Sequence, residues 1–231
     1  MFRKINNVLL IGVGHVIPKS LEEVRTKILE ERPEIVAVEL CPARYAALVG
    51  GVRNSRSSPA DPLSWFLGLL QEKFSSQTGM PAGREMVAAV DSAKQIGAAV
   101  VLIDQNILAT IERLYSLMPL REKFLLLVHI LFALLPFHRK IDMEALTEEA
   151  VAQNLVERFR KFFPTAARIL IDERDEYMTM KLLPLLSSGK KIVCVVGAAH
   201  IFGMERLLAE NLREVEKKFW WREKIEFKGG G

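Results

Sequence analysis

The stretch Ile192–His200, which reads IVCVVGAAH, decides the fold predicted for this chain. Its first five residues are apolar and mostly β-branched, which is typical of a short strand buried on both faces. Small residues follow, where they allow a tight turn and leave space for a ligand or a close contact. The stretch ends on a histidine, three positions after Gly197. We therefore expect a buried strand that brings an imidazole to one edge of a sheet.

The N-terminal region repeats this arrangement. An apolar run, Val8–Ile11, leads into Gly12, and His15 again stands three positions after the glycine. If the two strands lie side by side and parallel, His15 and His200 reach the same edge of the sheet. This convergence of two distant histidines is the strongest functional signal in the sequence.

Four segments share a short, β-branched apolar pattern that predicts strands: Asn7–Gly12, Ile35–Leu40, Ala98–Asp104 and Lys191–Gly197. Helical patterns lie between them. One is expected from Ser20, as the capping residue of a capping box with Glu23, to about Glu31. Another is expected over about residues 84–97. Alternating strands and helices predict an α/β fold with a mostly parallel central sheet flanked by helices.

Residues from about 107 to 186 show helical periodicity without a convincing strand, and Pro119, Pro136 and Pro164 divide them into separate helices. This predicts a helical insertion of about 80 residues before the last core strand. We expect one domain over residues 1–231, with an edge strand at Lys224–Phe227 and a disordered tail at 229–231.

The bulk composition limits the class of protein. The chain has 231 residues, of which 50% are hydrophobic and 26% charged, so a packed core is expected. A net charge of +4, spread along the chain, does not demand nucleic acid as a partner. Two distant cysteines, Cys41 and Cys194, form neither a zinc motif nor a disulfide framework. With no signal peptide at the N-terminus, these features predict a cytoplasmic protein.

Two apolar features suggest a surface for association. The run Phe124–Leu135, broken by His129, is too short for a membrane-spanning helix and is expected to form a core or interface helix. Trp220 and Trp221 either cap the core or anchor the chain to a membrane surface or a partner. A homodimer is the preferred interpretation of the apolar helix. Membrane association is expected if the native chain extends beyond this C-terminus.

Ionisable residues stand at the carboxyl ends of the four predicted strands, where ligands bind in open α/β sheets: His15, Glu39, Asp104 and His200. Two imidazoles with one or two carboxylates suit a divalent transition metal, with Mn, Co and Zn as candidates. Each residue also has a structural alternative. Each histidine could be a hydrogen-bonded structural residue, Glu39 could bond a backbone amide or Arg44, and Asp104 could cap the following helix.

Two arginines are candidates for substrate binding. Arg44 follows Glu39 by about one turn and could clamp a carboxylate or phosphate. Arg174 lies in the charged run 172–175 and shares a helix face with Met178. Charged runs are usually solvated faces, so spacing alone places Arg174 outside the site. Sequence motifs for a serine or cysteine nucleophile elbow, a Walker A loop or a dinucleotide fingerprint are absent.

At these residues the chain resembles the TraB/PrgY family, relatives of the GumN and Tiki proteins, over about residues 7 to 210. The resemblance rests on the order of several blocks rather than on one motif. They are Leu10–His15 with Ser20 and Val24; Pro33–Cys41 with Arg44 and Leu48; Glu85–Met86 with Ala89 and Ala93; Asp172–Asp175; and Val195–His200 with Gly203. The chain departs from the family where Asp-Arg-Asp often follows the third strand, because it has Asp104, Gln105 and Asn106.

The resemblance implies an α/β fold in which both Gly-x-x-His elements and a glutamate face one site. By this match His15, Glu39 and His200 carry over as site residues, and Arg44, Glu85, Arg174 and Asp175 carry over as further candidates. Tiki relatives imply metal-dependent proteolysis with manganese or cobalt. PrgY-type relatives imply binding or shutdown of a peptide pheromone.

Three hypotheses follow. The first is a metal-dependent hydrolase acting on a peptide or small-molecule substrate, in which His15 and His200 hold the ion and Glu39 is a ligand or general base. Arg44 or Arg174 would hold a substrate carboxylate or the developing oxyanion. The second is a peptide-binding or sequestering module that uses the same cleft without turnover. The third is a membrane-surface scaffold.

Overall fold

The fold is built on a five-stranded sheet with the order β1-β2-β5-β3-β4. The computed structural model describes residues 1–14, 18–50, 83–134 and 149–228, with side chains at 1–14, 20–50, 83–129 and 149–214. The strands are β1 (Phe2–Ile5), β2 (Val8–Val13), β3 (Ile35–Val38), β4 (Ala99–Leu102) and β5 (Ile192–Gly197). Only β1 runs antiparallel to its neighbour, so the predicted mostly parallel α/β sheet is confirmed.

The register of the three central strands sets the position of the site. In β5, Val195 lies opposite Ile11 of β2 on one side and Val38 of β3 on the other. The segments that follow β2, β3 and β5 therefore leave the sheet at nearly the same level. Strand β5 is the middle strand of the five, so the turn after Gly197 lies at the centre of this edge.

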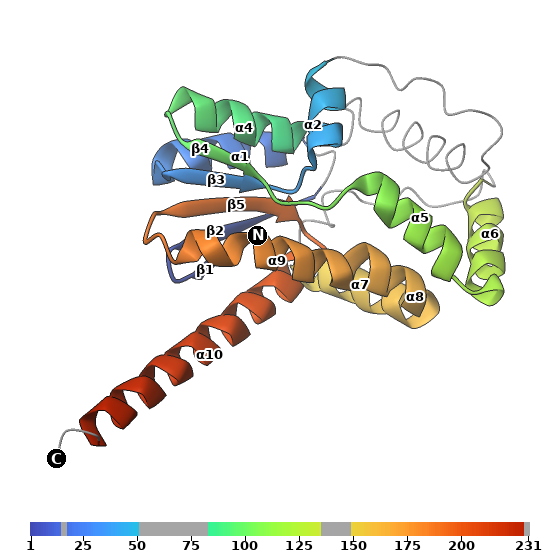
Figure 1. The fold of residues 1–231 in the computed structure, drawn as a ribbon. Coiled ribbons are helices and arrows are strands. Elements are labelled where there is room, and N and C mark those ends of the chain that lie inside the picture. The colour runs from blue at the N-terminus through green and yellow to red at the C-terminus, as the bar shows by residue number, and fades with distance from the viewer. Residues whose placement is uncertain (15–17, 51–82, 135–148, 229–231) are drawn as a thin grey trace.

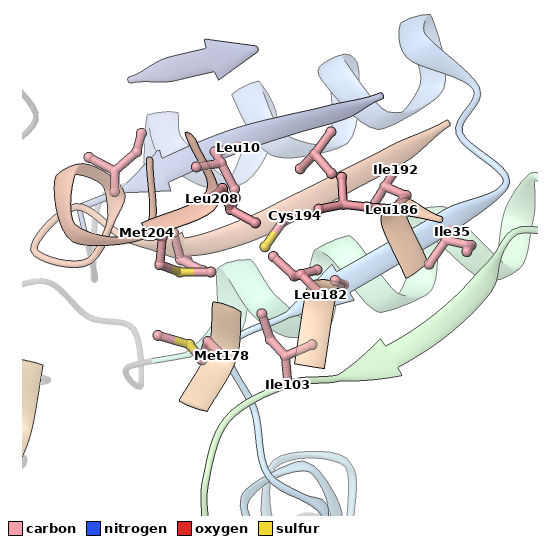
Figure 2. Packing of buried hydrophobic residues seen from close by; sticks show 14 residues of the cluster. Leu10, Ile35, Ile103, Met178, Leu182, Leu186, Ile192, Cys194, Met204 and Leu208 are labelled. Carbon is pink, nitrogen blue, oxygen red and sulfur yellow. The ribbon is translucent and has the colours of Figure 1, made fainter. Parts of the chain in front are cut away.

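Helices bury both faces of the sheet, which explains why the central strands are continuously apolar. On one face, Val193 and Val195 pack in a cluster with residues of α1 (Pro18–Glu31) and α4 (Arg84–Gln95). On the other face, α9 (Glu173–Leu186) and α10 (Ile201–Lys228) pack on the sheet. Figure 2 shows this second cluster, in which Cys194 of β5 lies among side chains of both helices.

The helical insertion is also confirmed. Between β4 and β5 the described chain forms α5 (Ile107–Leu117), α6 (Leu120–Leu134), α7 (Glu149–Phe162), α8 (Pro164–Ala167), the π-helical turn η2 (Arg168–Asp172) and α9. Pro119 separates α5 from α6, and Pro164 begins α8, in agreement with the expected boundaries. Pro136 lies outside the described residues. Figure 1 shows α5, α6, α7 and α8 extending to one side of the sheet, while α9 lies along the sheet and the later part of α10 projects away from it.

Two expectations from the sequence were wrong, and one strand was missed. Helix α1 begins at Pro18, so Ser20 lies inside the helix and does not cap it; proline favours a first helical turn. Residues 224–227 continue α10 instead of forming an edge strand, because no glycine or proline interrupts the chain from Met204 to Lys228. Strand β1 was not anticipated. The hairpin that joins it to β2 contains Asn6 at a φ of 52°, a conformation that asparagine tolerates.

Helix α6 contains the described part of the apolar run that begins at Phe124. Leu125 and Leu126 pack beside the small cluster around Leu114 and Ile169, whereas Phe124 is exposed. His129 is exposed in the single chain and so is not a core residue, and its Nδ1 lies 2.8 Å from the Leu125 carbonyl oxygen of its own helix; the interface alternative stays a prediction. Within the described ranges, we find no helix with the length and apolar character needed to cross a bilayer. The Trp220 and Trp221 side chains and residues 229–231 lie outside the described set.

The N-cap of α5 is Asn106, not Asp104. The Asn106 side-chain oxygen accepts a hydrogen bond of 3.0 Å from the backbone N–H of Leu108. Replacing Asn106 with alanine should lower the free energy of unfolding by about 1 kcal/mol, because that N–H loses its partner. Urea denaturation measures the loss, and Asn106→Asp, which retains a capping oxygen, is the control. Equal stability of all three proteins would contradict the assignment.

Candidate functional site

Arg174 is the centre of a buried polar network at the carboxyl edge of the sheet. Its Nε donates to Oδ1 of Asp104 at 3.0 Å, and its Nη2 donates to Oδ2 at 2.9 Å. The same Nη2 also donates a very short hydrogen bond to Oε1 of Glu39. The guanidinium side chain is only 13% exposed, so these are charge-assisted bonds in a largely desolvated place. One arginine thus links the ends of β3 and β4 to the start of α9.

His200 is the second member of this network, and it follows β5. Its Nδ1 lies 2.6 Å from Oδ1 of Asp175, and its Nε2 lies 3.1 Å from Nη1 of Arg174. The same Nε2 is 3.4 Å from Oε1 of Glu39. Because a carboxylate is an acceptor, Asp175 fixes the proton on Nδ1. In the neutral ring Nε2 accepts from Nη1 of Arg174, whereas in the protonated ring its N–H points toward Oε1 of Glu39.

The backbone of β5 holds Glu39 in place. Its Oε2 accepts a 2.6 Å hydrogen bond from the N–H of Gly197, and its own N–H donates to the Val195 carbonyl oxygen at 3.0 Å. Glu39 follows directly after β3, so the pairing of β3 with β5 brings this carboxylate to the turn that leads to His200. The alternative in which Glu39 bonds a backbone amide is thus confirmed, and the structure identifies the amide as that of Gly197.

Two neighbouring charged residues in the first turn of α9 both point inward, just after the π-helical turn η2. Arg174 and Asp175 contact His200 at its two ring nitrogens, Arg174 at Nε2 and Asp175 at Nδ1. Side chains of adjacent residues diverge by about 100° around a helix, so only a central group such as this imidazole meets both. Insertions of π-type geometry are frequent at functional sites. The interpretation of residues 172–175 as a solvated face was therefore wrong for Arg174 and Asp175.

Burial and charge shift the ionisation of these groups in distinct ways. Burial disfavours the charged imidazole, but the negative charge of Glu39 and the hydrogen bond to Asp175 raise the pKa of His200 to about 9. Burial raises the pKa of Asp175 above its usual value, although the bond to His200 opposes this. Burial also disfavours a charged Arg174, but Glu39 and Asp104 outweigh it and raise its pKa further.

Arg44 lies at the rim of the network. Its Nη1 is 3.6 Å from Oδ2 of Asp104, and its side chain is 29% exposed, the largest exposed fraction among the charged groups around Asp104. The alternative that paired Arg44 with Glu39 is replaced by this contact with Asp104. Glu85 is buried in the first turn of α4. A Cβ built on Gly83 would lie 3.8 Å from Nη2 of Arg44, so the start of α4 lies beside this arginine.

The structure therefore brings together most of the residues singled out in the sequence. Glu39, Asp104, Arg174, Asp175 and His200 form one network, and Arg44 touches it through Asp104. His15 lies outside the described residues. Gly203 was part of the closing block of the family resemblance and had no separate role there; its contact with Asp175 is visible only when α9 and α10 are packed together.

The described donors fit part of the expected divalent metal site. Nε2 of His200 and Oε1 of Glu39 converge, and Asp175 holds the other ring nitrogen, as a carboxylate commonly does for a metal-binding histidine. Nη1 of Arg174 now occupies the acceptor position of Nε2, so a metal ion held by Nε2 and by Oε1 of Glu39 would replace this bond and would compete with the bond from Nη2 of Arg174 to Oε1. The two bonds from Arg174 to Asp104 would remain. Among the side chains that are described, no three His, Cys, Asp or Glu residues by themselves form a metal site.

Comparison with known proteins assigns the family. The sequence profile of the TraB/PrgY/gumN family matches residues 3–215, which is nearly the whole chain. The chain belongs to the TraB/PrgY/gumN family. The resemblance seen in the sequence motifs is thereby confirmed, and the network of the TraB-family chain is built mostly from those motif residues.

Similar proteins come from archaea and mammals. The TraB-family chain is 30% identical to an uncharacterized protein of Methanocaldococcus jannaschii, an alignment that covers 94% of this chain and 58% of that protein. It is 25% identical to TraB domain-containing proteins of mouse and human, covering 90% of this chain and 64% of each relative. The chain thus spans less than two thirds of the length of these relatives.

Proposed function

We propose that the network around His200 is the catalytic site of a metal-dependent hydrolase that acts on peptides. The observation that carries the proposal is the orientation of His200, with Nδ1 bonded to Asp175 and Nε2 facing Glu39. This arrangement presents two converging donors at the carboxyl edge of a parallel sheet, where ligands bind in such folds. Membership in the TraB/PrgY/gumN family supports the assignment without specifying a reaction.

In this proposal His200 and Glu39 hold a divalent transition ion together with His15. Such an ion, when bound, polarises a carbonyl group and lowers the pKa of water. Asp175 keeps the His200 ring in one orientation and one tautomer, so that Nε2 carries a lone pair. Arg174 offsets part of the negative charge of Asp104 and Glu39 and holds both carboxylates in place.

Arg44 is the substrate-binding group in this proposal. It is the most exposed of the charged side chains that surround Asp104, and its guanidinium can still form a forked pair with a substrate carboxylate. A buried Arg174 is already bonded on three of its nitrogens, so it is suited to fixing the site rather than to capturing a substrate. A peptide with a free or side-chain carboxylate near the scissile bond fits this arrangement.

Cleavage of a peptide library in the presence of Mn²⁺, Co²⁺ or Zn²⁺, read by mass spectrometry, tests the proposal. We expect products from the wild-type chain and a loss of roughly 100-fold in rate for Glu39→Gln, because the amide lacks the charge of the carboxylate. Glu210→Gln, on an exposed part of α10, is the matched control and should retain the wild-type rate. Equal rates for the two variants would remove Glu39 from the site.

The second candidate is a module that binds or sequesters peptides without turnover. It is favoured by one observation: Arg174 already pairs with Glu39 and Asp104, which suits a preorganised receptor. Saturable peptide binding that depends on Arg44, without any cleaved product in the presence of the three metals, would support this candidate against the first. Homodimer formation, membrane-surface association and a cytoplasmic location stay predictions.

A further inference from the structure

Gly203, in the first turn of α10, lies against the carboxylate of Asp175. A Cβ built on Gly203 would stand 1.9 Å from Oδ2 and 2.8 Å from Cγ of Asp175. Both distances are far below van der Waals contact, so any side chain at position 203 requires the carboxylate to move. Asp175 is buried and is bonded through Oδ1 to Nδ1 of His200 at 2.6 Å. The same carboxylate therefore meets the helix backbone on one side and the imidazole on the other.

A neighbouring cavity gives the carboxylate a place to go if it is displaced. This cavity of about 290 Å³ lies between α7, α9 and α10, and its walls include Gln153, Arg160, Asp175, Phe202, Gly203 and Arg206. A side chain at 203 can thus push Asp175 toward the cavity while the surrounding core keeps its packing. The expected result is a folded protein in which His200 has lost its carboxylate partner.

We propose that Gly203 is a positioning residue of the site: the absence of a side chain there holds the Asp175 carboxylate against Nδ1 of His200. Glycine costs stability within a helix, and this close contact gives a physical reason for its presence at 203. The consequence for catalysis rests on the proposed function, whereas the contact itself does not. Loss of a carboxylate that orients a functional histidine typically lowers metal affinity or activity by 10- to 100-fold.

Proton NMR of the metal-free full chain tests the contact directly. The short Nδ1–H to Asp175 bond should give a far-downfield imidazole proton resonance, which is assigned by its absence in His200→Gln. In Gly203→Ala this resonance should shift upfield or disappear, and it should behave as it does in Asp175→Ala. An unchanged resonance in a folded Gly203→Ala protein would overturn the proposal.

A stability comparison in two backgrounds provides a second test. Gly203→Ala should lower the Tm of the wild-type chain, because the new methyl group collides with the carboxylate. In the Asp175→Ala background the collision is gone, and the same change should leave the Tm unchanged or raise it, because alanine favours a helix. Equal losses of Tm in both backgrounds would show that position 203 acts independently of Asp175, and they would overturn the proposal.

These measurements separate this inference from the proposed function. Both are made without metal or substrate, so they remain valid if no peptide is cleaved. If the chain does hydrolyse peptides and Gly203→Ala keeps the wild-type resonance and rate, the positioning role is wrong and the hydrolase assignment stands. If the resonance changes and no hydrolysis is found for the wild-type chain, the positioning role stands and the catalytic proposal is wrong.

Discussion

Replacing Arg174 with alanine should lower the free energy of unfolding by about 3–5 kcal/mol, the typical cost of breaking a buried ion pair. The change removes the guanidinium that bonds Asp104 through two nitrogens and Glu39 through one. Both carboxylates are almost completely buried, so they would lose the bonds of this guanidinium in a place that water hardly reaches, and Arg44 would remain near Asp104. Denaturant unfolding followed by circular dichroism measures the loss.

Arg160→Ala is the matched control for this prediction. Arg160 also forms a two-nitrogen pair, with Asp172 at 2.6 and 2.8 Å, but the two side chains are 47% and 36% exposed. A solvated pair of this kind is worth at most about 1 kcal/mol. Arg174→Lys keeps the positive charge but loses the planar guanidinium that bonds two carboxylates at once. The stability of this variant should therefore lie between those of the wild type and Arg174→Ala. Equal losses for Arg174→Ala and Arg160→Ala would contradict the central role of Arg174.

Replacing His200 with glutamine should abolish stoichiometric binding of a divalent transition metal. The imidazole Nε2 is one of the two described donors that converge, and the glutamine amide is a poor ligand for such an ion. Elemental analysis of protein purified without chelator measures the metal per chain. We expect a stoichiometric ion in the wild type and background levels in His200→Gln, with hydrolysis lost in parallel.

His129→Gln is the control for this experiment, because His129 is exposed on α6 and bonds a carbonyl of its own helix. It should keep the wild-type metal content, which separates the site from adventitious binding by surface histidines. Equal metal content in both variants would remove His200 from the ligand set. A wild-type chain without metal, whose hydrolysis also resists chelator, would instead point to acid–base chemistry by the His200 and Asp175 pair.

Much of the fold was predictable because buried strands and helices have characteristic local patterns of apolar residues. The β-branched run at Ile192–Val196 can be buried on both faces only in a covered sheet, and it forms the middle strand. Proline at 119 and 164 set helix boundaries by removing a backbone donor. Strand β1 was harder to predict, because an edge strand of four half-exposed residues carries little hydrophobic pattern.

The candidate site was predictable only in part. Glu39 and His200 end buried strands, so their role could be inferred from the principle that parallel strands present their carboxyl ends together. Arg174 could not be placed by periodicity, because a run of four charged residues is usually a solvated helix face. Its inward position depends on the buried His200, Glu39 and Asp104, which come from distant parts of the chain.

The sequence by itself determined the parallel sheet, the helical insertion and the strand ends that carry Glu39, Asp104 and His200, because each depends on patterns within a few neighbouring residues. Only the tertiary structure decided which partner each charge takes. Arg174 rather than Arg44 pairs with Glu39, and Asp175 holds Nδ1 of His200. These choices depend on how α9 and α10 pack on the sheet, where a contact as close as that between Gly203 and Asp175 fixes the geometry.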